Sequence, residues 1–292
     1  MATQDPSFIG FGEAAMAFAG GLSASGYDRK LADPATRAAK LADFDALHAE
    51  AAMTNHAAVA GKAVILSLVT ADQARAAAEE TALSIAPGAL FCDLNSVAPE
   101  TKRHAAQAIE QAGGRYVDVA VMAPVHPLGR KVPLLVAGPH AEAGAEALTT
   151  FGFTNVRIVG ASIGAASATK MIRSVMVKGL EALTAECLLA AEAAGVRDEV
   201  LASLDASERA RPWAERGAYN LERMIVHGGR RAEEMVEVVK TLDALGTGSA
   251  MARATTERQR AIGALGVAPT DTLDSTLALL NARLSPAVGC AA

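Results

Sequence analysis

The sequence predicts an α/β domain with a parallel, doubly wound sheet, followed by an all-α domain. In the first half, short apolar runs alternate with alanine-rich helical segments, which is the order typical of such a sheet. From residue 162 onward almost no segment resembles a strand. Residues 166–194 form one apolar-periodic stretch closed by Gly195, which predicts a long interdomain helix. We therefore expect domains at residues 1–161 and 162–292.

Residues that interrupt regular structure bound the predicted elements. Residues 62–70, for example, are apolar and lie between Gly61 and Asp72, while Pro99 suits the first turn of a helix. The predicted strands are 7–10, 23–28, 62–70, 89–94, 115–121 and 131–137. The predicted helices of the first domain are 13–22, 71–84 and 99–112, and those of the second are 197–209, 213–226, 230–244, 250–265 and 271–284.

Composition excludes several classes of protein. The chain has 292 residues, of which 51% are hydrophobic and 20% charged, so it has the apolar content for a core and does not resemble a disordered chain. A net charge of −5 and only 4% aromatic residues disfavour nucleic-acid binding. No uncharged run is long enough to span a membrane, and the first residues lack a secretory signal. Three distant cysteines suggest neither disulfides nor a metal site, so we expect a soluble, cytoplasmic protein.

A glycine-rich turn near the N-terminus predicts a dinucleotide site. Residues 9–15, IGFGEAA, fit G-x-G-x-x-A between a predicted strand and a predicted helix. Gly10 permits a tight turn, Gly12 lets the backbone approach a pyrophosphate, and the small Ala15 allows the helix to pack on the strand. The alternative is a tight turn with a structural role alone.

The residues after the second predicted strand bear on the choice of nucleotide. Asp28 lies 18 residues after Gly10, near the offset of a carboxylate that binds the adenosine ribose. Arg29 and Lys30 follow directly and suit a 2′-phosphate instead. We favour NAD, with NADP left open, and a solvated turn aspartate is the alternative for Asp28.

Four ordered segments, which together cover nearly the whole chain, point to a known family. They are IGFGEAA at 9–15, DLNSVAPE at 93–100, DVAVMAPV at 118–125 and GASIGAASATK at 160–170. Together they resemble the β-hydroxyacid dehydrogenase superfamily, the group of 6-phosphogluconate and 3-hydroxyisobutyrate dehydrogenases. The stretch AYNLERM at 218–224 is similar to a poorly characterised branch of it. The resemblance implies a Rossmann-type N-terminal domain and NAD or NADP as cofactor. The cofactor-binding residues we then expect are Gly10, Phe11, Gly12, Glu13, Ala14, Asp28, Arg29, Val69, Thr70 and Asn95.

The same resemblance implies that Lys170 is the general acid/base. A lysine in an apolar cleft beside Arg173 has its charged form disfavoured, which suits proton transfer near neutral pH. The alternative is a surface lysine on an amphipathic helix. Ser174 stands where the family has asparagine, on the same helix face at i+4, and offers a hydroxyl in place of an amide.

The substrate side departs from the family pattern. His126-Pro127-Leu128 replaces a Ser-Gly-Gly segment, so we expect a divergent substrate loop in which His126 assists catalysis. A loop histidine satisfied by backbone is the equal alternative. A structural role is the alternative for Arg173 and Arg230. For Trp213 and Tyr219 the alternative is packing in the core. The predicted substrate-binding residues are Ser96, Met122, Ala123, Pro124, Val125, Arg173, Trp213, Tyr219 and Arg230.

These observations predict an NAD(P)-dependent oxidoreductase that interconverts an alcohol, such as a hydroxy acid, and a carbonyl. No metal is expected. A lyase that cleaves a β-hydroxy substrate on the same scaffold and a non-catalytic nucleotide sensor are the competing hypotheses. The long interdomain helix suggests a homodimer. We expect Glu186 to be a surface charge on that helix.

Overall fold

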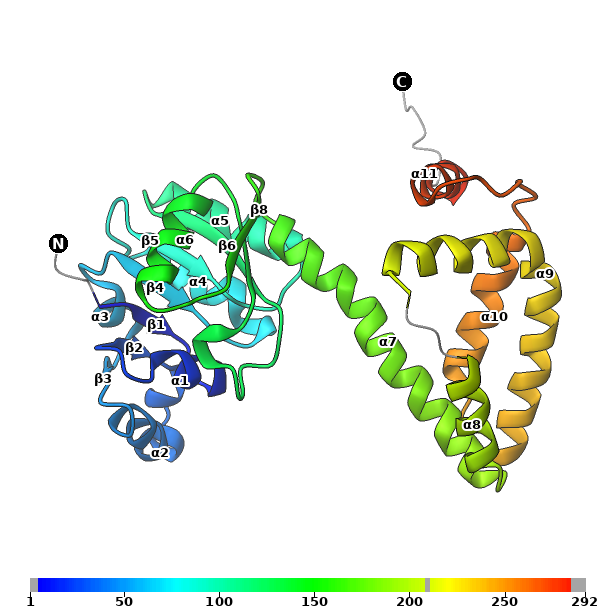
Figure 1. Cartoon of the computed structure of the whole chain (residues 1–292). Helices are drawn as coiled ribbons and strands as arrows, with labels where there is room; N and C mark the ends of the chain where they lie inside the picture. Colours follow the sequence, from blue (N-terminus) through cyan, green and yellow to red (C-terminus); the bar gives the residue numbers. More distant parts are fainter. Residues whose placement is uncertain (1–4, 208–210, 285–292) are drawn as a thin grey trace. The chain divides into compact units, whose positions relative to one another are not determined.

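The computed structural model describes residues 5–207 and 211–284 of the chain (Figure 1). The chain divides into two compact units, residues 1–176 and 177–292. The division falls inside helix α7 (Ala165–Ala193), and not at residue 161 where we expected the domain boundary. The predicted long helix is present almost to the residue. The α/β fold followed by an all-helical region confirms the predicted fold class.

The first unit is built on one eight-stranded sheet in the order β3-β2-β1-β4-β5-β6-β7-β8. Its winding direction reverses between β1 and β4, the place where open α/β sheets bind ligands at the carboxyl ends of the strands. Strands β3 and β8 were not predicted. The strands are β1 (Ser7–Ile9), β2 (Ser25–Tyr27), β3 (Glu50–Ala51), β4 (Val64–Ser67), β5 (Leu90–Asp93), β6 (Arg115–Val121), β7 (Leu134–Ala137) and β8 (Val156–Gly160).

One strand pair corrects the expectation of a parallel sheet. Strand β7 pairs with β6 in antiparallel orientation, with Val121 opposite Leu134. The chain between them holds only the 3-10 turn η3 (Gly129–Lys131) and no crossover helix, which a parallel connection normally requires. The segment after β6 therefore turns back at the carboxyl end of the sheet and stays beside the predicted ligand crevice.

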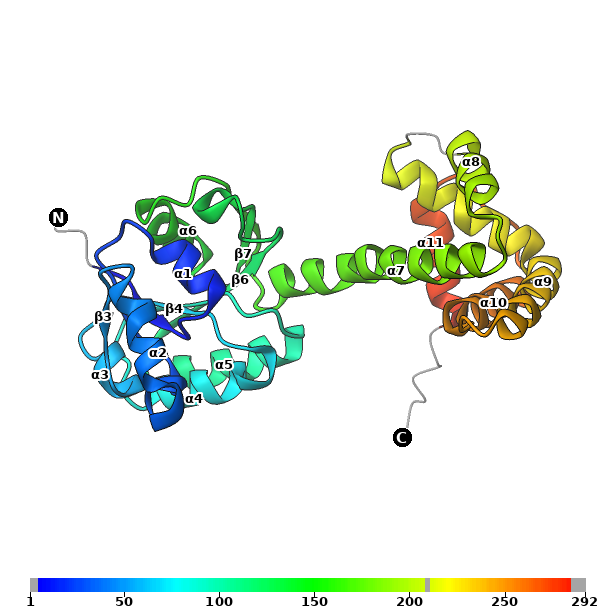
Figure 2. The same cartoon turned by 90° about the horizontal axis from the view of Figure 1, so that it is seen from below.

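Helices cover both faces of this sheet (Figure 2). Helices α1, α2 and α6 bury an apolar cluster that includes Phe8, Phe18 and Phe44, and α3, α4 and α5 bury a second one around Phe91 and Tyr116. Of the six, α2, α3 and α6 were not predicted. The helices are α1 (Glu13–Ala19), α2 (Pro34–Asp45), α3 (Asn55–Val59), α4 (Ala74–Ala82), α5 (Pro99–Gln111) and α6 (Ala141–Thr150).

The second unit contains α8 (Arg197–Ser207), α9 (Trp213–Leu245), α10 (Ala250–Gly263) and α11 (Leu273–Leu284), beside the end of α7. The predicted helix 197–209 extends past α8 into residues 208–210, which lie outside the described ranges. In the part of the chain that is described, no helix is both long and apolar enough to cross a membrane.

Helix α9 corrects a second expectation. We predicted two helices, 213–226 and 230–244, but one helix of 33 residues spans both. Gly228 sits where α9 crosses α10, and a Cβ atom there would lie 2.4 Å from the main-chain oxygen of Gln259 and 2.9 Å from the Cα atom of Gly263. The glycine therefore allows two helices to approach closely, and this packing offsets its low helix propensity.

The crossing predicts opposite effects for two adjacent glycines. Gly228→Ala forces a methyl group against rigid backbone and is expected to destabilise the second unit by about 1–3 kcal/mol. Gly229→Ala meets nothing within 4 Å and is expected to stabilise the helix by about 0.5–1 kcal/mol. Urea unfolding followed by the fluorescence of Trp213, the single tryptophan, reports on this unit. Equal effects of the two substitutions would contradict the assignment.

Candidate nucleotide and catalytic site

The glycine-rich turn joins β1 to α1 at the point where the sheet reverses. Gly10 has φ +86°, and a Cβ atom on it would lie 2.4 Å from the main-chain oxygen of Leu68, so glycine is required there. A Cβ atom on Gly12 would meet nothing within 4 Å, which leaves that side of the turn open. Among the residues described, no side chain caps α1, so the first amides of Glu13 and Ala14 remain available for an anion. The turn fits a pyrophosphate.

A single residue in the turn, Phe11, is held from several sides. The Phe11 amide donates to Asp28 Oδ2 at 2.9 Å, and its carbonyl oxygen accepts from Lys40 Nζ at 2.8 Å. Its ring is fully buried and stacks on Phe44 with centroids 3.8 Å apart. The Lys40 ammonium also pairs with Asp43 at 2.6 Å. Phe11, which we expected beside the nucleotide, is thus occupied in positioning the turn.

Asp28 has two tasks at the end of β2. One carboxylate oxygen accepts from Phe11 and the other from the Lys30 amide, at 2.9 Å each. A carboxylate offers about four acceptor positions, so two remain for hydroxyl groups of a ligand. Arg29 and Lys30 are exposed beside it. The acidic side chain that would favour NAD and the basic side chains that would favour NADP therefore lie next to one another.

Asn95 braces the neighbouring loops at the ends of β4 and β5. Its Oδ1 accepts from the half-buried Val69 amide at 2.6 Å, and its Nδ2 donates to Ser67 Oγ at 2.9 Å in a buried setting. Val69 is half-buried and Thr70 is exposed. Asn95 thus fixes the position of Val69 and Thr70, two of the residues predicted to contact the nucleotide, from behind.

Lys170 meets Ser96 at the carboxyl edge of the sheet. Lys170 lies in the second turn of α7, and its Nζ donates to Ser96 Oγ at 2.5 Å. One turn further along, Arg173 Nη1 lies 3.4 Å from the carbonyl oxygen of Met122. Ser174 Oγ donates to the main-chain oxygen of Lys170 at 3.0 Å, a bond internal to the helix. The structure thus brings Lys170, Ser96, Arg173 and Met122 together.

The loop after β6 continues from Met122 toward the glycine-rich turn. Ala123 and Val125 are half-buried, and Pro124 is exposed. His126 is exposed as well, and its Nε2 lies 3.9 Å from Glu13 Oε1 at the start of α1. His126 therefore stands on the nucleotide side of the site.

A fully buried charged cluster lies behind Ser96 and Lys170, and the sequence pattern did not predict it. Lys102 Nζ lies 2.9 Å from Asp93 Oδ1 and 3.6 Å from Asp118 Oδ1. Tyr116 donates its hydroxyl proton to Asp93 Oδ2 at 2.6 Å, and burial followed by the Asp93 charge raises the pKa of Tyr116 well above its usual value. The signal available in the sequence was a pair of aspartates, each closing or interrupting an apolar strand.

Of the two cysteines in the described part of the chain, neither adds a nucleophile to this site. Burial raises the pKa of Cys92 to about 12, so its thiol stays protonated. Cys187 is an exposed free thiol in the second unit, and Cys290 lies outside the described residues.

The remaining predicted substrate residues belong to α9. The Arg216 guanidinium lies over the exposed Trp213 ring at 5.2 Å, and Tyr219 has Arg211 and Arg223 at 5.3 and 5.6 Å from its ring centroid. Arg230 is exposed in the middle of the helix, and not at a helix start as we expected, because α9 continues through Gly228.

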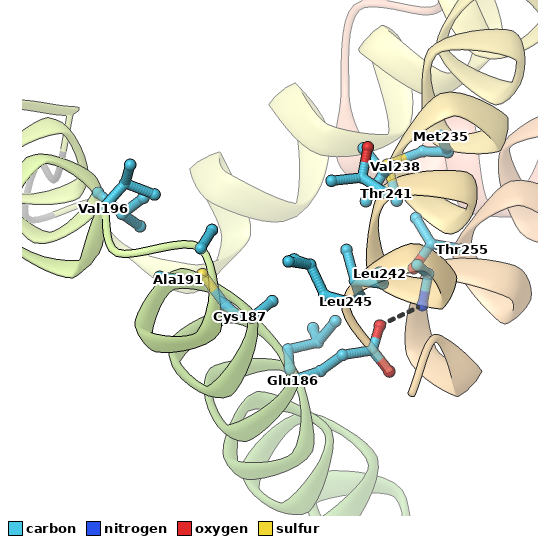
Figure 3. A pocket seen from close by; sticks show the side chains of 15 residues that line it. Glu186, Cys187, Ala191, Val196, Met235, Val238, Thr241, Leu242, Leu245 and Thr255 are labelled. Atoms are coloured by element: carbon cyan, nitrogen blue, oxygen red, sulfur yellow. Dashed lines mark hydrogen bonds between the residues drawn. The ribbon is translucent and has the colours of Figure 1, made fainter. Parts of the chain in front are cut away.

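An apolar pocket of about 340 Å³ is lined by residues of the second unit alone (Figure 3). Its walls include Leu183, Val238 and Leu245. Glu186 points toward α10 and accepts from the amides of Met251 and Ala252, at 2.8 Å each. Glu186 is therefore a capping carboxylate for α10, which corrects its assignment as a surface charge. The mostly apolar lining of the pocket favours a role in helix packing over a role in catalysis.

Comparison with known families decides the relationship. The model for the NAD binding domain of 6-phosphogluconate dehydrogenase matches residues 6–151, and a domain of unknown function, DUF1932, matches residues 191–262. The chain belongs to the β-hydroxyacid dehydrogenase superfamily. The first domain of this superfamily member is an NAD(P)-binding domain, as predicted.

Solved structures support the same fold over the whole chain. A conserved hypothetical protein of Sinorhizobium meliloti is 39% identical, with 97% of each chain covered and a TM-score of 0.61. A conserved protein described as similar to 3-hydroxyacid dehydrogenases is 28% identical, with 90% of this chain and 100% of that chain covered and a TM-score of 0.57. An imine reductase of Myxococcus stipitatus in complex with NADP⁺ is 20% identical, with 94% of this chain and 99% of that chain covered and a TM-score of 0.71.

One curated relative matches about half of the chain. It is an uncharacterised 28.5 kDa protein encoded beside the 7S RNA of Methanothermus fervidus, 28% identical over 151 residues. The match covers 52% of this chain and 57% of that protein, little more than half of each.

Proposed function

We propose that this protein is an NAD(P)-dependent oxidoreductase that interconverts an alcohol and a carbonyl, with Lys170 as general acid/base. The observation that carries the proposal is the contact of Lys170 Nζ with Ser96 Oγ. It lies at the carboxyl edge of a sheet whose central turn fits a pyrophosphate. The family of the first domain supports the nucleotide.

In this proposal each group of the chain has a separate task. A bound nicotinamide supplies the hydride acceptor or donor. Neutral Lys170 takes the hydroxyl proton as the alcohol is oxidised and returns it in the reduction. Ser96 orients the Lys170 amine, while Arg173 and the loop from Met122 to Val125 bind the substrate beside it. His126, near Glu13, assists from the nucleotide side. In this scheme Trp213, Tyr219 and Arg230 contribute substrate contacts from the helical region.

Lys170→Met tests the proton-transfer role. Turnover is expected to fall by about 10²–10⁴ because the proton loses its carrier, while the Kd of the nucleotide changes less than about threefold. The matched control is Lys178→Met, an exposed lysine on the same helix, which should leave both quantities unchanged.

The nucleotide is identified first, by the thermal shift that NAD or NADP produces. The substrate is then sought in a panel of hydroxy compounds and imines, and turnover is followed by the absorbance of the reduced nicotinamide. Product formed without net absorbance change would overturn the oxidoreductase. The absence of a shift with either nucleotide would overturn the site.

For the nucleotide we propose NAD as the preferred cofactor. Asp28 keeps two acceptor positions for ribose hydroxyls, and its charge opposes a 2′-phosphate. Asp28→Asn is expected to raise the ratio of kcat/KM for NADP over NAD about tenfold, because the repulsion is lost while Arg29 and Lys30 remain. Asp33→Asn, five residues on, makes the same charge change and should leave the ratio as it is. A wild-type preference for NADP would contradict the assignment.

We also propose that the protein works as a homodimer. Ile172, Met176, Leu180 and Leu183 lie on one face of α7 at helical spacing and are 43–71% exposed. A second copy of the chain would cover this face and bury its apolar side chains.

Leu180→Glu places a charge on that face and is expected to turn the dimer into a monomer in light scattering after size-exclusion chromatography. Lys178→Glu, exposed on the same helix, serves as the charge control and should remain dimeric. A monomeric wild-type chain at micromolar concentration would contradict the proposal.

A further inference from the structure

Lys102 is fully buried, and yet it faces two carboxylates on neighbouring strands. Its Nζ lies 2.9 Å from Asp93 Oδ1, 2.5 Å from the Asp93 carbonyl oxygen and 3.6 Å from Asp118 Oδ1. Within the described ranges, Asp118 Oδ1 has no hydrogen-bond donor, so the Lys102 ammonium is its main compensation. One ammonium between two carboxylates leaves a net buried charge of −1, which is costly unless the geometry is fixed.

Each of these carboxylates holds a different piece of the catalytic site. Asp93 Oδ1 accepts from the Asn95 amide at 2.9 Å, next to Ser96. Asp118 Oδ2 accepts from the amides of Gly164 and Ser167 at 3.0 and 3.2 Å, at the start of the helix that carries Lys170. Lys102 is thus the ionic link between the segment of Ser96 and the segment of Lys170.

A second contact joins the same two segments, the start of α7 and the loop after β5. Ser167 Oγ donates to the carbonyl oxygen of Val97, the residue after Ser96. The start of α7 and the loop after β5 are therefore tied at Ser167–Val97 and, through Lys102, at Asp118–Asp93. Lys170 on the first of these segments and Ser96 on the second then contact each other.

We propose that Lys102 is a positioning residue that holds Lys170 and Ser96 in contact through Asp118 and Asp93. The inference rests on the proposed role of Lys170. A role in stability alone is the competing explanation, and buried ion pairs are weak evidence for stability, because apolar replacements are often equally stable. The distinguishing property is the environment of the Lys170 amine.

The test uses the double variant Lys102→Met/Asp118→Asn in the full chain. It removes the ionic link but retains the wild-type net buried charge of −1, and the asparagine oxygen still accepts from Gly164 and Ser167. Asp118→Asn alone is the matched variant, since it keeps Lys102 beside Asp93. Thermal unfolding establishes that each variant folds.

The readout is the pH dependence of acetylation of Lys170 by acetic anhydride, measured by peptide mass spectrometry with Lys178 as internal reference. In the double variant we expect the Lys170 midpoint to move to lower pH, because a hydroxyl acceptor that stabilises the ammonium is lost. The Kd of the nucleotide should change less than about threefold while kcat falls at least about tenfold.

An unchanged Lys170 profile in a folded double variant overturns the proposal. If the double variant does not fold, Asp118→Asn decides: a shifted Lys170 profile supports the link, and a wild-type profile overturns it. The acetylation readout requires no turnover. A wild-type protein that binds no nucleotide or oxidises no alcohol therefore refutes the proposed function without deciding the role of Lys102.

Discussion

The buried carboxylate of Asp118 is the point on which the arrangement of the first unit depends. Helix α7 begins against the sheet, where Gly164, Ala166 and Ser167 are buried. A buried helix start must find acceptors, and Asp118 supplies them from the middle of β6 to Gly164 and Ser167. The direction of α7, and with it the place of Lys170, follows from a side chain on a strand. The helix that carries Lys170 is thus positioned by the sheet and not by its own sequence alone.

The nucleotide turn obeys the same rule, that main-chain groups at the sheet edge are held by side chains from elsewhere. Asp28 holds the amide of Phe11 and Lys40 holds its carbonyl, from segments 17 and 29 residues away. A glycine-rich turn is flexible by composition, and these contacts remove that freedom before a ligand arrives. Preorganisation of the turn and of Lys170 therefore has one physical origin, which is the satisfaction of polar groups at the carboxyl ends of the strands.

Local pattern sufficed for the α/β class, the long helix α7 and the turn at Gly10, because each is encoded in neighbouring residues. It failed where a distant partner decides. Gly228 indicated a helix end by propensity, yet α10 lies against it and the helix continues. The antiparallel β7 was missed because its direction is set by the short connection from β6, which holds no crossover helix, and not by the strand itself. Lys102, Lys40 and Glu186 had ordinary sequence surroundings, and their partners lie across the fold.

The substitution of Ser174 for the family's asparagine acquires a structural meaning from these contacts. Its hydroxyl donates its only proton to the carbonyl of Lys170 within the helix, so it faces the site as an acceptor alone. An amide in that place would offer donors to a substrate. The orientation of the Lys170 amine then falls to Ser96, on a loop fixed by Asn95 and the Lys102 cluster. In the proposed function, a site with one donor fewer on the helix depends for its polar groups on the loops that carry Ser96 and His126.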